Sequence, residues 1–243
     1  MESNVEKQAG QNAVEWSEAA VADEEFEVIA NLCDKRVATY GLLARVYRTE
    51  VDKALIDELK QMRFPAHSDN EFMDEGYRLI VGYLSSLWEN SLFELSVDYV
   101  RAFIGHGVNG HAAAYPYESA YRSEKHLLMQ DARDEVLAVY RASGFDTGKD
   151  WKEGEDHAAA ELEFMQALVA RAAEQARAHD EEALLSTLRT QANFMDDHVL
   201  LWMPTFAHEV TEFAQTDFYR GFADLTAGYL QEDRSLLKGL LED

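Results

Sequence analysis

Apolar residues recur at alternating steps of three and four along most of the chain. The clearest run lies between residues 185 and 202, where one helical face would consist of Leu185, Leu188, Ala192, Met195, Val199 and Trp202. Similar runs cover residues 76–88, 128–140, 158–172 and 218–229. This is the period of an amphipathic helix, and no long stretch has the two-residue alternation of a half-buried strand. The pattern predicts an all-α fold, built as one globular helical bundle.

Two segments that are rich in helix-breaking residues interrupt this pattern. The breakers are Gly105, Gly107, Asn109, Gly110 and Pro116 in the first segment, and Gly144, Gly148 and Gly154 in the second. Both segments are predicted to be loops, over residues 105–117 and 143–155. The first is also a candidate sub-boundary near residues 104–117 between two helical halves. The alternative is that tertiary contacts merge the halves into one domain.

The first 25 residues differ from the rest in composition. They carry seven carboxylates against the single cation of Lys7, with scattered alanines and little apolar surface. We expect an acidic, poorly ordered N-terminal tail or a loose helix over residues 1–25, and the folded domain over residues 26–243.

Charge and cysteine content exclude several classes of protein. With 22 Lys and Arg against 46 Asp and Glu, the formal net charge is −24. Such a surface repels phosphate backbones, so nucleic acid is not an expected partner, whereas a cationic peptide would be attracted. The single Cys33 excludes an intramolecular disulfide and any multi-cysteine metal site.

Targeting signals are absent from the sequence as given. The first residues lack the basic start and apolar run of a secretory signal, and no apolar stretch approaches the ~20 residues that span a bilayer. These features predict a cytoplasmic protein without stable membrane insertion.

Metal and catalytic motifs are missing as well. None of the eight histidines has a glutamate three positions before it, and no two histidines stand four apart, so neither the di-iron bundle nor the zincin spacing occurs. His157 and Glu161 are four apart, but a surface or capping role is favoured for this pair. Ser119 does not stand in a nucleophile elbow, and there is no phosphate-binding loop. We predict no catalytic residues, no metal and no cofactor.

Two short segments carry residues that packing alone does not require. The segment Tyr115–Tyr121 places three tyrosines around a helix start, where they are either half-buried or available to a peptide. The segment Glu153–His157 holds three carboxylates and a histidine ahead of an apolar helix. Asp156 is predicted to cap that helix, and the group would also form an anionic mouth able to hold an arginine.

These segments resemble motifs of the TorD/DmsD family of redox-enzyme maturation chaperones, which is related to the NarJ-type assembly factors. The matching stretches are Tyr99–Gly105, Tyr115–Tyr121, Glu153–Met165, His198 with Trp202 and Pro204, and the pair Phe218–Tyr219. The similarity runs from about residue 99 to about residue 230. Three positions depart from the family pattern, namely Ala102 for a leucine, His106 for a proline and Gly154 for the motif proline.

The resemblance implies an all-helical cytoplasmic chaperone of TorD-like type and no enzymatic activity. Its implied partners are the twin-arginine signal peptide and the catalytic subunit of a molybdopterin-dependent oxidoreductase, held until the molybdenum cofactor is inserted. Carried over to this chain, the apolar groove would be lined by Tyr99, Phe103, Tyr117 and Tyr121, and the polar mouth by Glu153, Asp156 and His157. The implied peptide-binding set also includes Glu118, Ser119, His198 and Trp202.

Alternatives from other classes stay open at this point. A hemerythrin- or ferritin-like metal-binding protein is disfavoured by the missing ligand spacings, and a metal assay would separate the two hypotheses. A subunit that stays bound to its oxidoreductase would show itself by co-purification. The sequence fits a monomer or a homodimer, including one that exchanges helical halves across the first loop.

Overall fold

Most of the chain that the computed structural model describes is helical. The description covers residues 2–105, 113–122, 131–148 and 151–242, with the backbone alone for residues 2–22. The elements are α1 (Glu2–Arg48), α2 (Lys53–Leu59), α3 (Glu71–Ser85), α4 (Ser91–Tyr99), η1 (Val100–Ile104), α5 (Glu118–Arg122), α6 (Asp131–Ala142), α7 (Ala158–Arg177), α8 (Glu181–Phe194), η2 (Met195–Val199), α9 (Leu200–Phe213) and α10 (Asp217–Glu242). The described residues contain no strand, only an isolated bridge between Tyr117 and His157. The predicted all-α fold is confirmed.

Polar side chains in the sequence fix the starts of several helices. Asp52 accepts a hydrogen bond from the Leu55 amide at 2.8 Å ahead of α2, and Asp180 accepts one from the Ala183 amide at 3.1 Å ahead of α8. Asn70 caps α3 in the same way. Each side chain pairs an amide that the first turn of a helix leaves without a partner.

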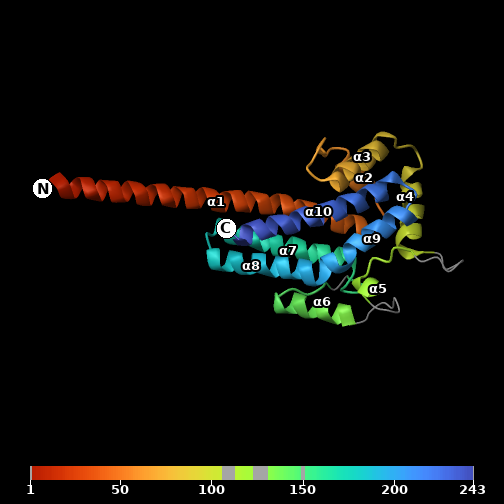
Figure 1. Ribbon diagram of the computed structural model, residues 1–243. Coiled ribbons are helices and arrows are strands. Elements are labelled where there is room, and N and C mark those ends of the chain that lie inside the picture. Colours follow the sequence, from red (N-terminus) through yellow and green to blue (C-terminus); the bar gives the residue numbers. More distant parts are fainter. Residues whose placement is uncertain (1, 106–112, 123–130, 149–150, 243) are drawn as a thin grey trace.

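Helix α7 lies at the centre of the bundle. It packs against α1 and α8, while α10 packs against α3, α8 and α9 (Figure 1). Many of the buried positions of α7 are alanines, which allow neighbouring helices to approach closely. The first part of α1 projects beyond the other helices (Figure 1). Residues 2–25 belong to α1 and have a helical backbone. The expected poor order of this segment stays a prediction.

A buried ion pair joins α1 to α10 in the core. Arg36 Nε lies 2.5 Å from Asp233 Oδ1, and the Tyr40 hydroxyl donates to Asp233 Oδ2 at 2.6 Å. A second nitrogen of Arg36 donates to Gln191 of α8 at 2.7 Å. Because both charges are almost fully buried, removing either one would leave the other without compensation in the core.

Helices α3 and α10 meet at two glycines. A Cβ atom on Gly76 would lie 2.7 Å from the carbonyl oxygen of Gly221, and one on Gly221 would lie 2.8 Å from that of Gly76. Both distances are too short for any side chain, so the two backbones are in direct contact here.

The structure corrects the expected end of the helical run over residues 76–88. Helix α3 stops at Ser85, and the side chain of Trp88 is 58% exposed instead of lying on the core face. The amide of Ser86 donates a hydrogen bond to the Tyr83 carbonyl, and the amide of Trp88 donates one to the Ser91 hydroxyl. These local bonds replace the next helical turn. No helix within the described ranges has the length and apolarity to cross a membrane.

Candidate peptide-binding site

The two motif segments that are far apart in sequence lie side by side. The amide of Glu118 donates to the Asp156 carbonyl at 2.9 Å, and the amide of Ala158 donates to the Pro116 carbonyl at 2.8 Å. These bonds flank the antiparallel bridge between Tyr117 and His157. The bridge therefore fixes the start of α5 against the start of α7.

Asp156 stabilises this junction instead of capping α7. Its carboxylate is fully buried, and Oδ2 accepts from the Ser119 amide at 3.0 Å. The cap is His157, whose Nδ1 accepts from the Ala159 amide at 3.0 Å. The predicted Asp156 cap is wrong, because the carboxylate is held by a segment 37 residues away in sequence.

His157 is an uncharged, buried side chain at neutral pH. It is 3% exposed and packs edge-on against the rings of Tyr117 and Trp151, with centroids 5.0 and 5.5 Å away. Burial, and secondarily the charge of Arg48, lowers the pKa of His157 to about 3. Its Nδ1 lone pair therefore stays free to accept the capping bond.

A buried carboxyl pair lies behind the two segments. Glu118 accepts from Arg122 at 2.8 Å, and its oxygens lie 3.2 Å from Nδ1 of His198 in the π-helical segment η2. Glu161 accepts from the Trp202 indole at 3.0 Å. Burial and the neighbouring charge of Glu118 raise the pKa of Glu161 well above its ordinary range, which favours the protonated form of this carboxyl group.

The predicted groove aromatics divide into core and surface positions. Tyr99 and Phe103 are 7% and 3% exposed, and their rings contact each other and Tyr219 in the core. Tyr121 is half-buried against Trp202, and its hydroxyl donates to Glu209 at 2.8 Å. Tyr117 is also half-buried.

The structure thus brings the predicted residues together mostly beneath the surface. Buried members of the set are Tyr99, Phe103, Glu118, Ser119, Asp156, His157, His198 and Trp202, while Tyr117, Tyr121 and Glu153 reach the surface. The hydroxyl of Tyr117 donates to Glu153 at 2.5 Å. Of the predicted set, only these three residues are therefore open to solvent, and the other eight are buried.

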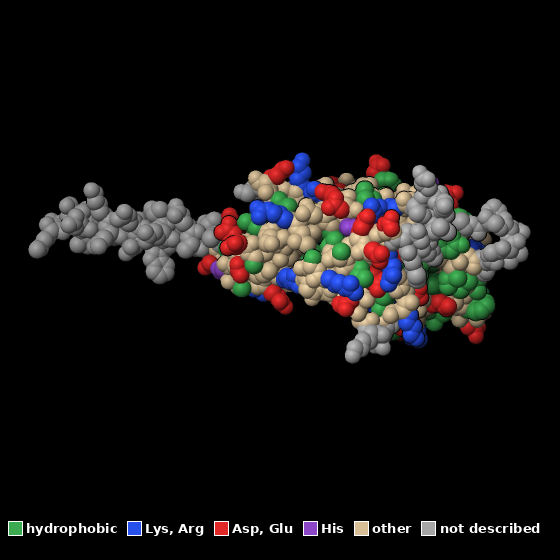
Figure 2. All heavy atoms as spheres, turned by 90° about the horizontal axis from the view of Figure 1, so that it is seen from below, with side chains coloured by type: hydrophobic (Ala, Val, Ile, Leu, Met, Phe, Trp, Pro, Cys, Tyr) green, Lys and Arg blue, Asp and Glu red, His purple; other side chains and the backbone are tan. Residues whose placement is uncertain are grey.

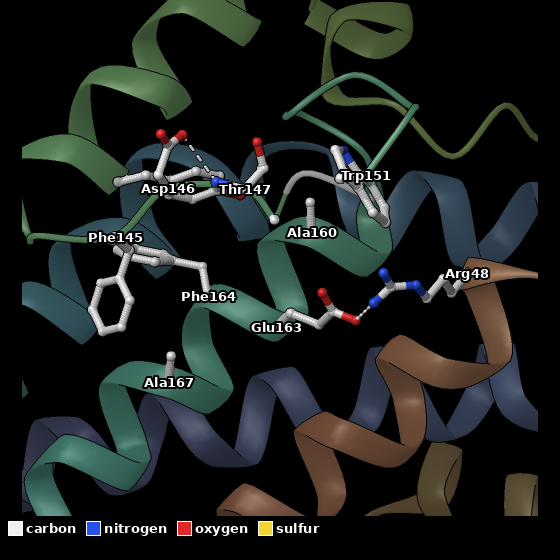
Figure 3. Close-up of a pocket in the computed structure, with 11 residues that line it drawn as sticks. Arg48, Phe145, Asp146, Thr147, Trp151, Ala160, Glu163, Phe164 and Ala167 are labelled. Carbon is white, nitrogen blue, oxygen red and sulfur yellow. Dashed lines mark hydrogen bonds and ion pairs between the residues drawn. The ribbon is translucent and has the colours of Figure 1, made fainter.

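An open pocket adjoins the second motif segment, and sequence reasoning missed it (Figure 3). It has a volume of about 220 Å³, with the rings of Phe145, Trp151 and Phe164 in its walls. The Trp151 indole donates to the Gly154 carbonyl at 3.1 Å, which ties the pocket to the motif. Figure 3 shows Glu163 and Arg48 pointing toward each other at its edge. Ala160, Glu163 and Phe164 of its lining lie in the Glu153–Met165 stretch, but their contact with Arg48 and with the preceding loop is tertiary and has no sequence signal.

The described residues include no cluster of three or more His, Cys, Asp or Glu side chains placed to hold a metal ion. His106, His111 and His126 lie outside the described residues, as does most of the first predicted loop.

Comparison with known proteins places these segments in a known family. The model of the nitrate reductase delta subunit family matches residues 68–208, which include both motif segments and more than half of the chain. The chain belongs to this family, the TorD/NarJ family.

Several relatives of this TorD/NarJ family member are named Chaperone protein TorD. The relative from Vibrio cholerae serotype O1 is 28% identical, over 87% of this chain and 96% of its own. That from Photobacterium profundum is 28% identical over 68% and 73%. That from Psychrobacter is 25% identical over 85% and 93%. These relatives support a chaperone of the redox-enzyme maturation class and not an enzyme.

Proposed function

We propose that this chain binds the twin-arginine signal peptide of a molybdopterin-dependent oxidoreductase precursor in the cytoplasm. It would also hold the catalytic subunit and assist cofactor insertion before export. The observation that carries the proposal is the pocket with aromatic and acidic walls beside the Glu153–His157 segment.

The chemistry of this pocket matches the two parts of such a peptide. A signal peptide presents arginines followed by apolar residues. The carboxylate of Glu163 suits a guanidinium, and the rings of Phe145 and Phe164 suit an apolar side chain. The net charge of −24 would steer a cationic peptide toward the protein from a distance.

The buried polar groups support the pocket by holding its wall in place. Asp156 and His157 each fix a backbone amide, and Trp151 bonds to the same loop through Gly154. A wall held in this way loses little conformational freedom when a peptide binds. The buried motif residues are accordingly positioning residues, and Tyr117 and Glu153 are the ones we expect the peptide to touch.

An exposed apolar surface offers a place for the larger client. It comprises Phe93 and Val97 of α4, Ile104 of η1 and Trp88 in the turn before α4, which are 72%, 38%, 57% and 58% exposed. Figure 2 shows apolar side chains gathered at the end of the molecule where α4 lies. A gathering of exposed apolar side chains typically marks a protein-binding surface, and we assign it to the catalytic subunit.

Calorimetric titration of the full chain with a twin-arginine peptide tests the proposal. The peptide should bind, a version with both arginines changed to lysine should bind at least several-fold more weakly, and salt should weaken both. Glu153→Gln should reduce the affinity, while Glu174→Gln should not, because this exposed residue lies near the far end of α7. Absence of binding to the arginine peptide would refute the proposal.

Co-purification separates a transient chaperone from a permanent subunit. The chain and the catalytic subunit of the oxidoreductase would be co-expressed, with and without molybdenum in the medium. A transient chaperone should be retained on the cofactor-free subunit and released once the cofactor is in place. Equal retention in both conditions would favour the permanent subunit.

A further inference from the structure

The pocket already contains an arginine from the chain itself. Arg48 is the last residue of α1, and its Nη1 forms an ion pair with the carboxylate of Glu163 on α7. Its guanidinium carbon also lies 5.0 Å from the ring centroid of Trp151. Figure 3 shows this arrangement at the edge of the pocket.

A carboxylate and an aromatic face together make a binding site for a guanidinium group. The carboxylate accepts charge-assisted hydrogen bonds, and the indole face attracts the delocalised cation. A lysine ammonium fits this pair less well because it is compact and strongly hydrated. Trp151 and Glu163 thus have the chemistry of an arginine subsite, and Arg48 shows how an arginine fits it.

We propose that Arg48 is an internal placeholder in this subsite, which an arginine of the client peptide displaces when it binds. The inference rests on the proposed function for the identity of its ligand. It adds which residues receive the arginine, and it makes the chain's own side chain a competitor.

The exposure of the pair fits displacement. The side chains of Arg48 and Glu163 are 43% and 38% exposed, so solvent can replace their contacts and the pair contributes little to folding. The ion pair between Arg36 and Asp233 is the opposite case, because its side chains are 3% and 1% exposed. Of these two pairs, only the one at the pocket can open without leaving a buried charge uncompensated.

The competitor hypothesis predicts a gain of affinity when Arg48 is removed. Arg48→Gln should bind the twin-arginine peptide about two- to fivefold more tightly than wild type, as loss of an exposed ion pair from the free state allows. Glu163→Gln should bind several-fold more weakly, because the incoming arginine loses its carboxylate.

Arg45→Gln is the matched control for long-range charge. Arg45 lies one turn earlier on α1, is 39% exposed, and pairs with Glu58 and Asp52 away from the pocket. The Arg45→Gln substitution changes the net charge by the same amount as Arg48→Gln. If both variants bind the peptide equally well, or if Arg48→Gln binds no better than wild type, the placeholder inference is overturned.

A small probe makes the test independent of the client. N-acetyl-arginine amide would be titrated into wild type and Arg48→Gln while NMR follows the Trp151 indole N–H, assigned with Trp151→Phe. The arginine probe should shift this signal at lower concentration in Arg48→Gln, and the lysine analogue should shift it less in both proteins. If the arginine probe shifts the signal as expected but the twin-arginine peptide does not bind, the proposed function is refuted and the inference about Arg48 stands. Equal responses of the two proteins to arginine would refute the inference.

Discussion

Replacing Glu161 with glutamine should make the protein more stable at neutral pH, although it removes a fully buried acid. Glu161 accepts from the Trp202 indole, and its pKa is raised by burial, by the charge of Glu118 and through a hydrogen bond with Glu118. Glutamine has the same shape as the protonated acid. It keeps one acceptor for Trp202 and one donor for Glu118, so the network should survive the change.

The size of the effect follows from proton linkage. In the unfolded chain Glu161 ionises near its reference pKa of about 4.3, whereas the folded protein keeps the proton to much higher pH. Unfolding therefore releases a proton, and raising the pH destabilises wild type by about 1.4 kcal/mol per pH unit until the folded pKa is reached. The glutamine variant lacks this contribution. Between pH 5.5 and 7.5 its advantage should grow by up to roughly 2.7 kcal/mol.

Urea unfolding followed by circular dichroism at several pH values measures this difference. The gap between Glu161→Gln and wild type should widen with pH, and the pH at which it levels off would give the folded pKa of Glu161. Glu174→Gln is the control, because the same change at an exposed position of α7 should leave the slope unaltered. A gap that stays constant across the range would mean that Glu161 is ionised in the folded protein.

Three further predictions concern the junction and the N-terminus. Asp156→Asn should lower the free energy of unfolding by about 1–3 kcal/mol in urea titrations, because the Ser119 amide loses a charged acceptor; a change of only a few tenths would show that a neutral amide oxygen serves the Ser119 amide equally well. Gly154→Ala should lower the thermal midpoint, since the new Cβ would lie 2.6 Å from Asp156 Oδ1; an unchanged midpoint would show that the loop relaxes freely. Removing the residues before Glu24 should leave the midpoint within a few degrees of wild type, and cooperative loss of helicity would show that they pack.

Sequence periodicity predicted the helices well where one face is buried along the whole element. Leu188, Ala192 and Val199 are buried as their spacing required, even though the run is divided between α8 and η2. The pattern failed at Trp88, because a bonded turn after Ser85 ends the helix before it. The spacing of apolar residues carries no information about whether hydrogen bonds of a turn will replace the next turn of a helix.

The site was less predictable because its contacts are non-local. Both motif segments can be found in the sequence, but the bridge between them cannot. The sequence therefore predicts that Asp156 caps α7, whereas His157 is the cap in the structure. The pair of Arg48 and Glu163 joins residues 115 positions apart, and no local pattern indicates that they meet. Positions that meet only through tertiary packing leave no mark in a single sequence.

The glycine contact between α3 and α10 restricts how this chain can diverge. Gly76 and Gly221 each touch the backbone of the other helix, so a larger residue on one side cannot be accommodated by a smaller one on the other. The usual exchange of volume between facing positions is therefore unavailable here. A relative with alanine or serine at either position must hold its two helices farther apart at this contact. These two positions should consequently change together with the spacing of the helices, and not independently of it.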